Sequence, residues 1–163
     1  MMRYGFLASV VLFFSMNGCV MADTDTQTCT PLVMKSENKE IVLPGPDEAH
    51  TSKLYIFKNT GEKSIWLDHP VLHPSVSAGW SSYLRTGNAS ALWVNRKNFN
   101  LSCAVIHPGK LEYLDCAKVV SVCAPKEVVY QTSRKGTFWL AEDSPWDDLM
   151  KMLTKRGVVI KVM

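Results

Sequence analysis

Short β-rich runs, separated by turn residues about every ten positions, are the feature that most restricts the fold of this chain. The runs are rich in Val, Ile, Tyr, Phe and Trp, and Gly, Asn or Pro follows most of them. Examples are KLYIFKNT, KSIWLDH, ALWVNR, KVVSVC and TFWLAED. Such spacing is typical of antiparallel sandwiches and barrels, and about nine runs are present. We therefore predict a mainly β protein, an antiparallel β-sandwich of immunoglobulin-like or similar type.

One amphipathic segment near the C-terminus has helical periodicity instead. Ser144 is suited to cap a helix and Pro145 to occupy its first position, because proline has no N–H to leave unpaired there. Apolar side chains then recur at the i, i+3, i+4 and i+7 spacing: Trp146, Leu149, Met150 and Leu153. The pattern predicts one C-terminal helix over residues 145–156, ended by Gly157 and packed across an open end of the sandwich.

The first 22 residues have the pattern of a secretory signal peptide. Arg3 is followed by the apolar run YGFLASVVLFFSM, which is too short to span a bilayer, since spanning needs about 20 residues. Val20 and Ala22 are small residues at the positions that a signal peptidase reads before a cut at Asp23. We therefore expect residues 1–22 to be removed and the protein to be periplasmic or secreted. The alternative is a lipoprotein site, in which Cys19 follows Gly18 and is acylated.

Removal of the signal peptide leaves 141 of the 163 residues, enough for one domain with a sizeable core. Arg3 is then lost, so that 17 of the 18 Lys and Arg residues remain against 15 acids. This weak positive charge, without a basic stripe, argues against nucleic-acid binding. We expect a loose N-terminal segment over residues 23–48, then a single sandwich domain over residues 49–163 with no transmembrane segment.

An even set of four cysteines remains after that cut, and in an exported chain it predicts two disulfides. The four are Cys29, Cys103, Cys116 and Cys123. Three pairings are possible, and we favour a bridge from Cys29 to one of the other three. A thiol nucleophile formed by Cys103 and His107 is disfavoured, because residues four apart in a strand lie more than about 12 Å apart.

Signatures of catalysis and metal binding are weak. The chain has no Gly-x-Ser-x-Gly motif and no set of Ser-x-x-Lys, Ser-Asp-Asn and Lys-Thr-Gly motifs. Asp68, His69 and His73 cluster in DHPVLH, but a proline follows each histidine, which favours an extended loop over a helical ligand pair. We predict a non-enzymatic protein without a cofactor or metal site. The alternatives are a peptidoglycan-modifying enzyme and a periplasmic metal-binding protein.

The segment around Tyr83 and Arg85 is the candidate binding surface. Strand alternation places Trp80 and Leu84 on one face and these two residues on the other. An aromatic ring and a fixed charge among small polar residues suit protein or glycan recognition.

Several phrases, taken in order, resemble the enhanced-entry protein B family, which comprises small exported envelope proteins of intracellular Gram-negative bacteria. They are YIFKNTGEKSIWLDHP, AGWSSYLRTGNASAL, the cysteine cluster and FWLAEDSPWDDL, within about residues 50 to 153. The resemblance implies an envelope accessory protein linked to cell-wall integrity, entry into host cells or intracellular survival. Its implied partner is an envelope protein, such as a helical-repeat or peptidoglycan-handling neighbour. The family contributes no active site, so no functional residue is transferred to this chain.

Overall fold

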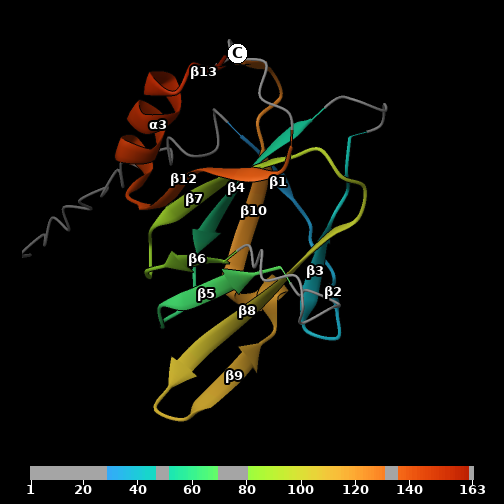
Figure 1. Cartoon of the computed structure of the whole chain (residues 1–163), viewed down its shortest axis with the longest axis vertical. Coiled ribbons are helices and arrows are strands. Elements are labelled where there is room, and N and C mark those ends of the chain that lie inside the picture. Colours follow the sequence, from blue (N-terminus) through green and yellow to red (C-terminus); the bar gives the residue numbers. More distant parts are fainter. Residues whose placement is uncertain (1–28, 47–51, 70–80, 131–135, 162–163) are drawn as a thin grey trace, which may run out of the picture.

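The computed structural model describes residues 29–46, 52–69, 81–130 and 136–161 (Figure 1). The predicted signal peptide, Cys19, Trp80 and His73 lie outside these residues. The described part is mainly β, with antiparallel sheets and a helix close to the C-terminus, as the sequence predicts.

The strands form two large antiparallel sheets and one small one. The first sheet has the order β1 (Thr30–Leu32), β10 (Val120–Ala124), β4 (Lys53–Asn59), β7 (Ala89–Val94) and β12 (Phe138–Ser144). The second has the order β2 (Ser36–Glu37), β3 (Glu40–Leu43), β8 (Phe99–His107), β5 (Ile65–Asp68) and β6 (Ser81–Leu84), with β9 (Lys110–Leu114) also paired to β8. The small sheet pairs β11 (Val128–Tyr130) with β13 (Val158–Ile160).

The main core lies between the two large sheets. Tyr55 and Phe57 of β4 point into it and are at most 1% exposed. From the second sheet they meet Ile41 of β3, Leu67 of β5 and Leu101 of β8, all completely buried. Side chains from two antiparallel sheets therefore fill one shared interior, which is the defining feature of a β-sandwich.

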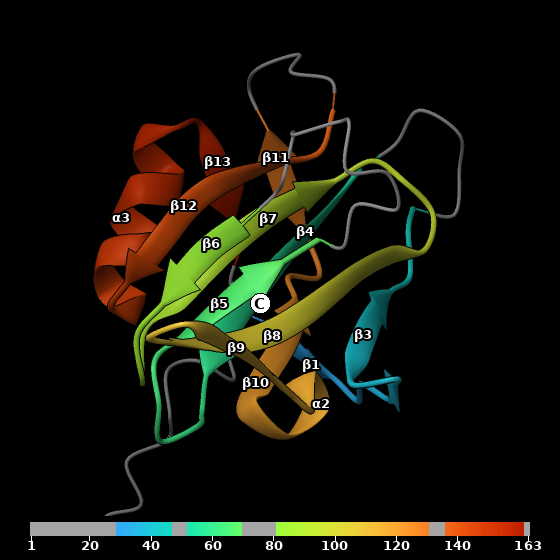
Figure 2. The same ribbon diagram turned by 60° about the horizontal axis from the view of Figure 1, so that its bottom comes forward.

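A second core covers the other face of the first sheet. Leu54 and Ile56 alternate with Tyr55 and Phe57 along β4, so the strand is buried on both faces. This explains its continuous apolar run, which an alternating half-exposed strand does not have. The helix α3 (Trp146–Lys155) supplies Leu149 and Leu153 to this core. Figure 2 shows α3 and β13 beside β12, on the side away from β5 and β8.

The C-terminal helix differs from the prediction in its start and its position. It begins at Trp146, after Pro145, and the Ser144 hydroxyl donates to the carbonyl of Glu142 instead of capping the helix. Ser144 is still paired in β12, so its side chain is not in position to reach the first turn. The helix covers a sheet face instead of an open end of the sandwich, and its apolar stripe packs there against the second core.

The N-terminal segment also differs from the loose connector that we expected. Residues 30–43 contribute β1 to the first sheet and β2 and β3 to the second. Ile41 and Leu43 are completely buried, and β3 pairs with the start of β8. The folded body therefore begins before residue 49.

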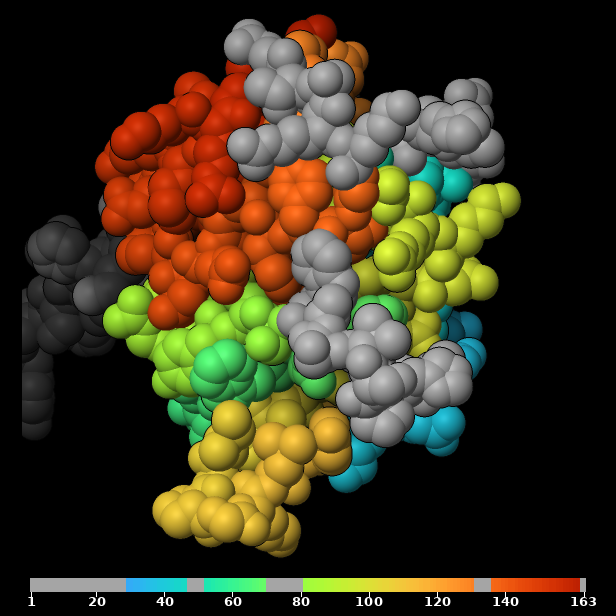
Figure 3. Space-filling view, viewed as in Figure 1, coloured from blue at the N-terminus to red at the C-terminus, as the bar shows by residue number. Residues whose placement is uncertain are grey.

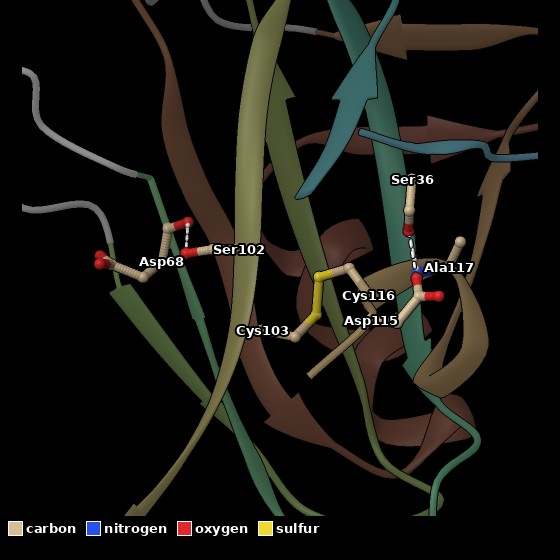
Figure 4. Close-up of a disulfide and its surroundings, with 7 residues drawn as sticks. All are labelled: Ser36, Asp68, Ser102, Cys103, Asp115, Cys116 and Ala117. Carbon is tan, nitrogen blue, oxygen red and sulfur yellow. Dashed lines mark hydrogen bonds between the residues drawn. A yellow bond between two sulfur atoms is a disulfide. The ribbon is translucent and has the colours of Figure 1, made fainter. Parts of the chain in front are cut away.

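Two disulfides join the four predicted cysteines. Cys29 bonds to Cys123 of β10, and Cys103 of β8 bonds to Cys116 of the short helix α2 (Cys116–Val119) (Figure 4). The partner of Cys29 is thus one of the three downstream cysteines, as we favoured. Such bridges persist in oxidising compartments, so they fit a protein located outside the cytoplasm. Within the described residues, no helix is both long and apolar enough to cross a membrane.

Candidate functional site

The outer face of the second sheet has a row of aligned residues across four strands, three of which are aromatic. The register aligns Tyr83 of β6 with Trp66 of β5, Trp66 with Ala104 of β8, and Ala104 with Tyr113 of β9. Directly paired residues point to the same side of a sheet. The opposite side is occupied by core residues such as Leu67, so this row faces away from the sandwich.

An aliphatic pair extends this row along the β8–β9 hairpin. Ile106 and Leu111 are cross-strand partners, and each lies two positions from a member of the aromatic row. We call the five large side chains of this face the outer-face patch: Trp66, Tyr83, Ile106, Leu111 and Tyr113. Ile106 is 60% exposed and Tyr113 48%. Exposed apolar side chains gathered on one face, unlike single scattered ones, mark an interaction surface.

Packing within the patch holds its aromatic end in place. The rings of Trp66 and Tyr83 have centroids 5.2 Å apart and an interplanar angle of 55°. Tilted arrangements of this kind are favoured by the ring quadrupoles. The patch therefore presents fixed rings on a sheet, with little side-chain entropy left to lose when a partner binds.

The β8–β9 hairpin is anchored at both ends. At its tip, Gly109 has a φ of 73°, which suits the Pro108–Gly109 turn. Next to the turn, His107 Nε2 lies 3.0 Å from Glu112 Oε2. At its base, the disulfide to Cys116 ties β8 to α2. The hairpin stands out from the rest of the molecule in Figure 3 and is therefore accessible to a large partner.

Hydrogen bonds to the N-terminal segment hold the residues that follow β9 at the base of the hairpin. The Ser36 hydroxyl donates to Asp115, and the amide of Ala117 donates to the Ser36 hydroxyl (Figure 4). The bond from Ser36 lowers the pKa of Asp115 below its ordinary value. The N-terminal segment, which we expected to be loose, thus supports the hairpin that carries the patch.

Polar residues border the patch on the β5 side. Asp68 lies two positions beyond Trp66, and its backbone carbonyl accepts a hydrogen bond of 3.3 Å from the Ser102 hydroxyl. Burial raises the pKa of the Asp68 carboxyl, although neighbouring His69 lowers it in part. A polar rim around an apolar centre is the usual composition of a protein interface.

Arg85, the second predicted binding residue, has a structural contact instead of a free charge. Its Nε donates to Asp143 Oδ2 at 2.7 Å, and its backbone N–H donates to Asp143 Oδ1 at 2.8 Å. These bonds tie the end of β6 to β12 and so join the two large sheets at one edge. We therefore leave Arg85 out of the outer-face patch and keep Tyr83.

Asp143 is the centre of this connection. Its φ is 40°, in the left-handed region that Asp and Asn tolerate better than other side chains, and Asn88 Nδ2 also donates to its carboxylate at 2.9 Å. Burial alone raises the pKa of Asp143, but the bonds from Arg85 and Asn88 outweigh burial, so the net pKa is below its ordinary value. The carboxylate form is therefore favoured in the folded state.

Replacing Asp143 with Asn tests this connection through pH. Asn keeps the backbone conformation but turns an N–H toward the Arg85 guanidinium, so we expect a loss of about 1 to 2 kcal/mol at pH 7. Because the pKa of Asp143 is lowered in the folded state, its carboxylate stabilises the fold fully above the ordinary value of 3.8. This stabilisation is lost as the pH falls through the pKa of the folded state. Urea unfolding at pH 7 and pH 2.5 should show the difference shrinking in acid. Glu142→Gln, at the exposed neighbouring position, is the control, and a difference that is equal at both pH values would contradict the assignment.

The histidine cluster considered for metal binding is only partly described. The His69 ring stacks on Phe99, with centroids 4.2 Å apart, and its Nδ1 lies 2.6 Å from the Asn100 carbonyl oxygen. Within the described ranges, no group of three or more His, Cys, Asp and Glu residues is arranged to hold a metal ion.

Of the five patch residues, the sequence pattern indicates only Tyr83 as a binding candidate and leaves out Trp66, Tyr113 and the aliphatic pair. The run LEYL, residues 111–114, is β-rich in the sequence, but its composition alone does not show which of its faces is exposed. Leu111 and Tyr113 alternate with Glu112, and two apolar positions on the outer side of a terminal hairpin are the signal that was present.

Comparisons with known proteins return nothing for this chain: no family model, no curated protein and no solved structure matches it.

Proposed function

We propose that this protein is an exported, non-enzymatic envelope protein that binds a protein partner through the outer-face patch. The observation that carries the proposal is the gathering of aromatic and aliphatic side chains on the solvent side of a rigid sheet. Aromatic anchors of this kind supply most of the binding energy in protein interfaces. The two disulfides support a location outside the cytoplasm.

The composition of the patch favours a protein over a glycan. Sugars stack on aromatic rings, which Trp66, Tyr83 and Tyr113 can offer, but Ile106 and Leu111 contribute no such platform. Branched and aliphatic side chains exposed beside rings match the buried centre of a protein interface. The resemblance to the enhanced-entry protein B family supports a partner in the envelope, such as a helical-repeat or peptidoglycan-handling protein. It also supports a role in cell-wall integrity, host-cell entry or intracellular survival.

Substitution in the patch tests the proposal. Ile106→Lys places a charge at the most exposed aliphatic position of the patch, where a bound partner would have to desolvate it. We expect at least a thirtyfold loss of the partner that wild-type protein retains in cross-linked pull-downs from envelope extracts, a typical effect at an interface hot spot.

A matched control lies on the small sheet. Val129 of β11 is 44% exposed, so Val129→Lys makes the same chemical change on another surface. Both variants should unfold at wild-type temperatures, because neither position is buried. Retention of the partner by Ile106→Lys, or its equal loss from both variants, would rule out the patch as the binding surface.

A further inference from the structure

The outer edge of β9 is open. β9 pairs with β8 along one edge, and no strand of the described residues pairs with the other. His107 and Lys110 close the two-residue turn as a hydrogen-bonded pair, and such pairs alternate along an antiparallel ladder. The backbone N–H and C=O groups of Leu111 and Tyr113 therefore point away from β8.

One contact supports this orientation. Lys39 Nζ donates to the backbone carbonyl of Tyr113 at 2.9 Å, from the turn between β2 and β3. This carbonyl is thus directed outward and accepts a donor. The N–H and C=O of Leu111 and the N–H of Tyr113 remain without a strand partner in the described part of the chain. They match the pattern that an added strand requires.

The charges beside this edge select the chemistry of a partner. Lys39 and Lys110 lie at its two ends, and neither makes an ion pair within the described residues. Glu112, between them, is held by His107, and the hydrogen bond from that histidine lowers the pKa of Glu112 below its ordinary value. Acidic side chains on an added strand would complement the two lysines.

A second copy of this chain is a poor occupant. Antiparallel self-pairing that uses the outward groups of Leu111 and Tyr113 places Glu112 directly opposite Glu112 of the other copy. Like charges at directly opposed positions destabilise a strand pair. The edge is thus better suited to a different chain.

We infer that a partner protein adds an extended segment as a further strand on the outer edge of β9, in which two apolar residues flank a neutral residue opposite Glu112 and an acidic residue stands at each end. Its apolar side chains lie on the same face as Leu111 and Tyr113 and so extend the outer-face patch. Its acidic side chains pair with Lys39 and Lys110. This inference rests on the proposed function and specifies how the partner is recognised.

Hydrogen exchange tests whether the edge is open in the free protein. The amide hydrogens of Leu111 and Tyr113 should exchange much faster than that of Glu112, which is bonded to β8. Strong protection of both outward amides would mean that the edge is already covered, and would overturn the inference.

Peptide titration of the mature chain tests the recognition itself. The probe is a capped nine-residue peptide, Thr-Thr-Glu-Val-Thr-Val-Glu-Thr-Thr, whose central threonine faces Glu112, and the control peptide has lysine in place of glutamate. In NMR titrations that follow the amide signals of Leu111 and Tyr113, the glutamate peptide should bind at least tenfold more tightly than the lysine peptide. Lys110→Glu should reverse this preference, whereas Lys126→Glu, at an exposed position away from the edge, should leave it unchanged. Equal binding of both peptides, binding at another surface, or none at millimolar concentration would overturn the inference.

The envelope pull-down separates this inference from the proposed function. If Lys110→Glu retains the partner while Ile106→Lys loses it, strand addition fails and binding through the patch stands. If Lys110→Glu and Ile106→Lys both lose the partner while Val129→Lys retains it, strand addition and binding through the patch both stand. If both variants retain the partner, both proposals fail.

Discussion

Removing the disulfide between Cys29 and Cys123 is expected to destabilise the folded protein by about 4 kcal/mol, because this bridge constrains a long loop in the unfolded chain. The two cysteines are 94 positions apart, and their Cα atoms are 5.5 Å apart in the fold. The paired substitution Cys29→Ala and Cys123→Ala avoids burying new hydroxyl groups. Urea unfolding of the purified mature protein measures the change.

The second disulfide provides the comparison. Cys103 and Cys116 are only 13 positions apart, so their replacement by alanine should cost about 3 kcal/mol in the same chain-entropy description. The order of the two losses is the informative result. A larger loss from the shorter bridge would mean that native packing around the hairpin base, and not loop closure, dominates.

Replacing Asn59 with Ala is expected to cost about 3 to 5 kcal/mol, the second of the two largest effects. This side chain is 1% exposed, and its Nδ2 donates to the carbonyls of Lys63 and Leu84 at 2.9 Å each. Its Oδ1 accepts from the amide of Gly61 at 2.9 Å. Alanine would leave these backbone groups unpaired near the core, at about 1 to 3 kcal/mol for each group that water does not reach.

Asn59 has this effect because it joins the two sheets. It ends β4 of the first sheet, whereas Leu84 ends β6 of the second. Asn100→Ala is a suitable control, since the side chain of Asn100 makes a single hydrogen bond of 3.3 Å, to Glu40, among the described residues. Thermal unfolding should show a clearly lower midpoint for Asn59→Ala and a change of less than about 1 kcal/mol for the control. Equal effects would mean that Asn59 is not an inter-sheet connection.

The outer-face patch shows which parts of a binding surface can be predicted from alternation within single strands. Alternation alone placed Tyr83 on the opposite face from Leu84, and β6 has this arrangement. Alternation cannot say which strands share a sheet with β6, so Trp66 on the adjacent β5 and Tyr113 on the more distant β9 were not recognised as members of the same face. Arg85 shows the reverse case, because its partner Asp143 lies 58 positions later and no local signal connects them.

What this sequence determined by itself was the mainly β class, the helical stripe and the four cysteines available for bridges. These follow from period, residue type and parity, which are local or countable properties. The tertiary structure decided the rest. β1 and β2 are too short to be recognised alone and exist because β10 and β3 supply their hydrogen-bond partners. The outer-face patch likewise formed only when β5, β6, β8 and β9 aligned in register, since strand pairing is a long-range property that single segments do not encode.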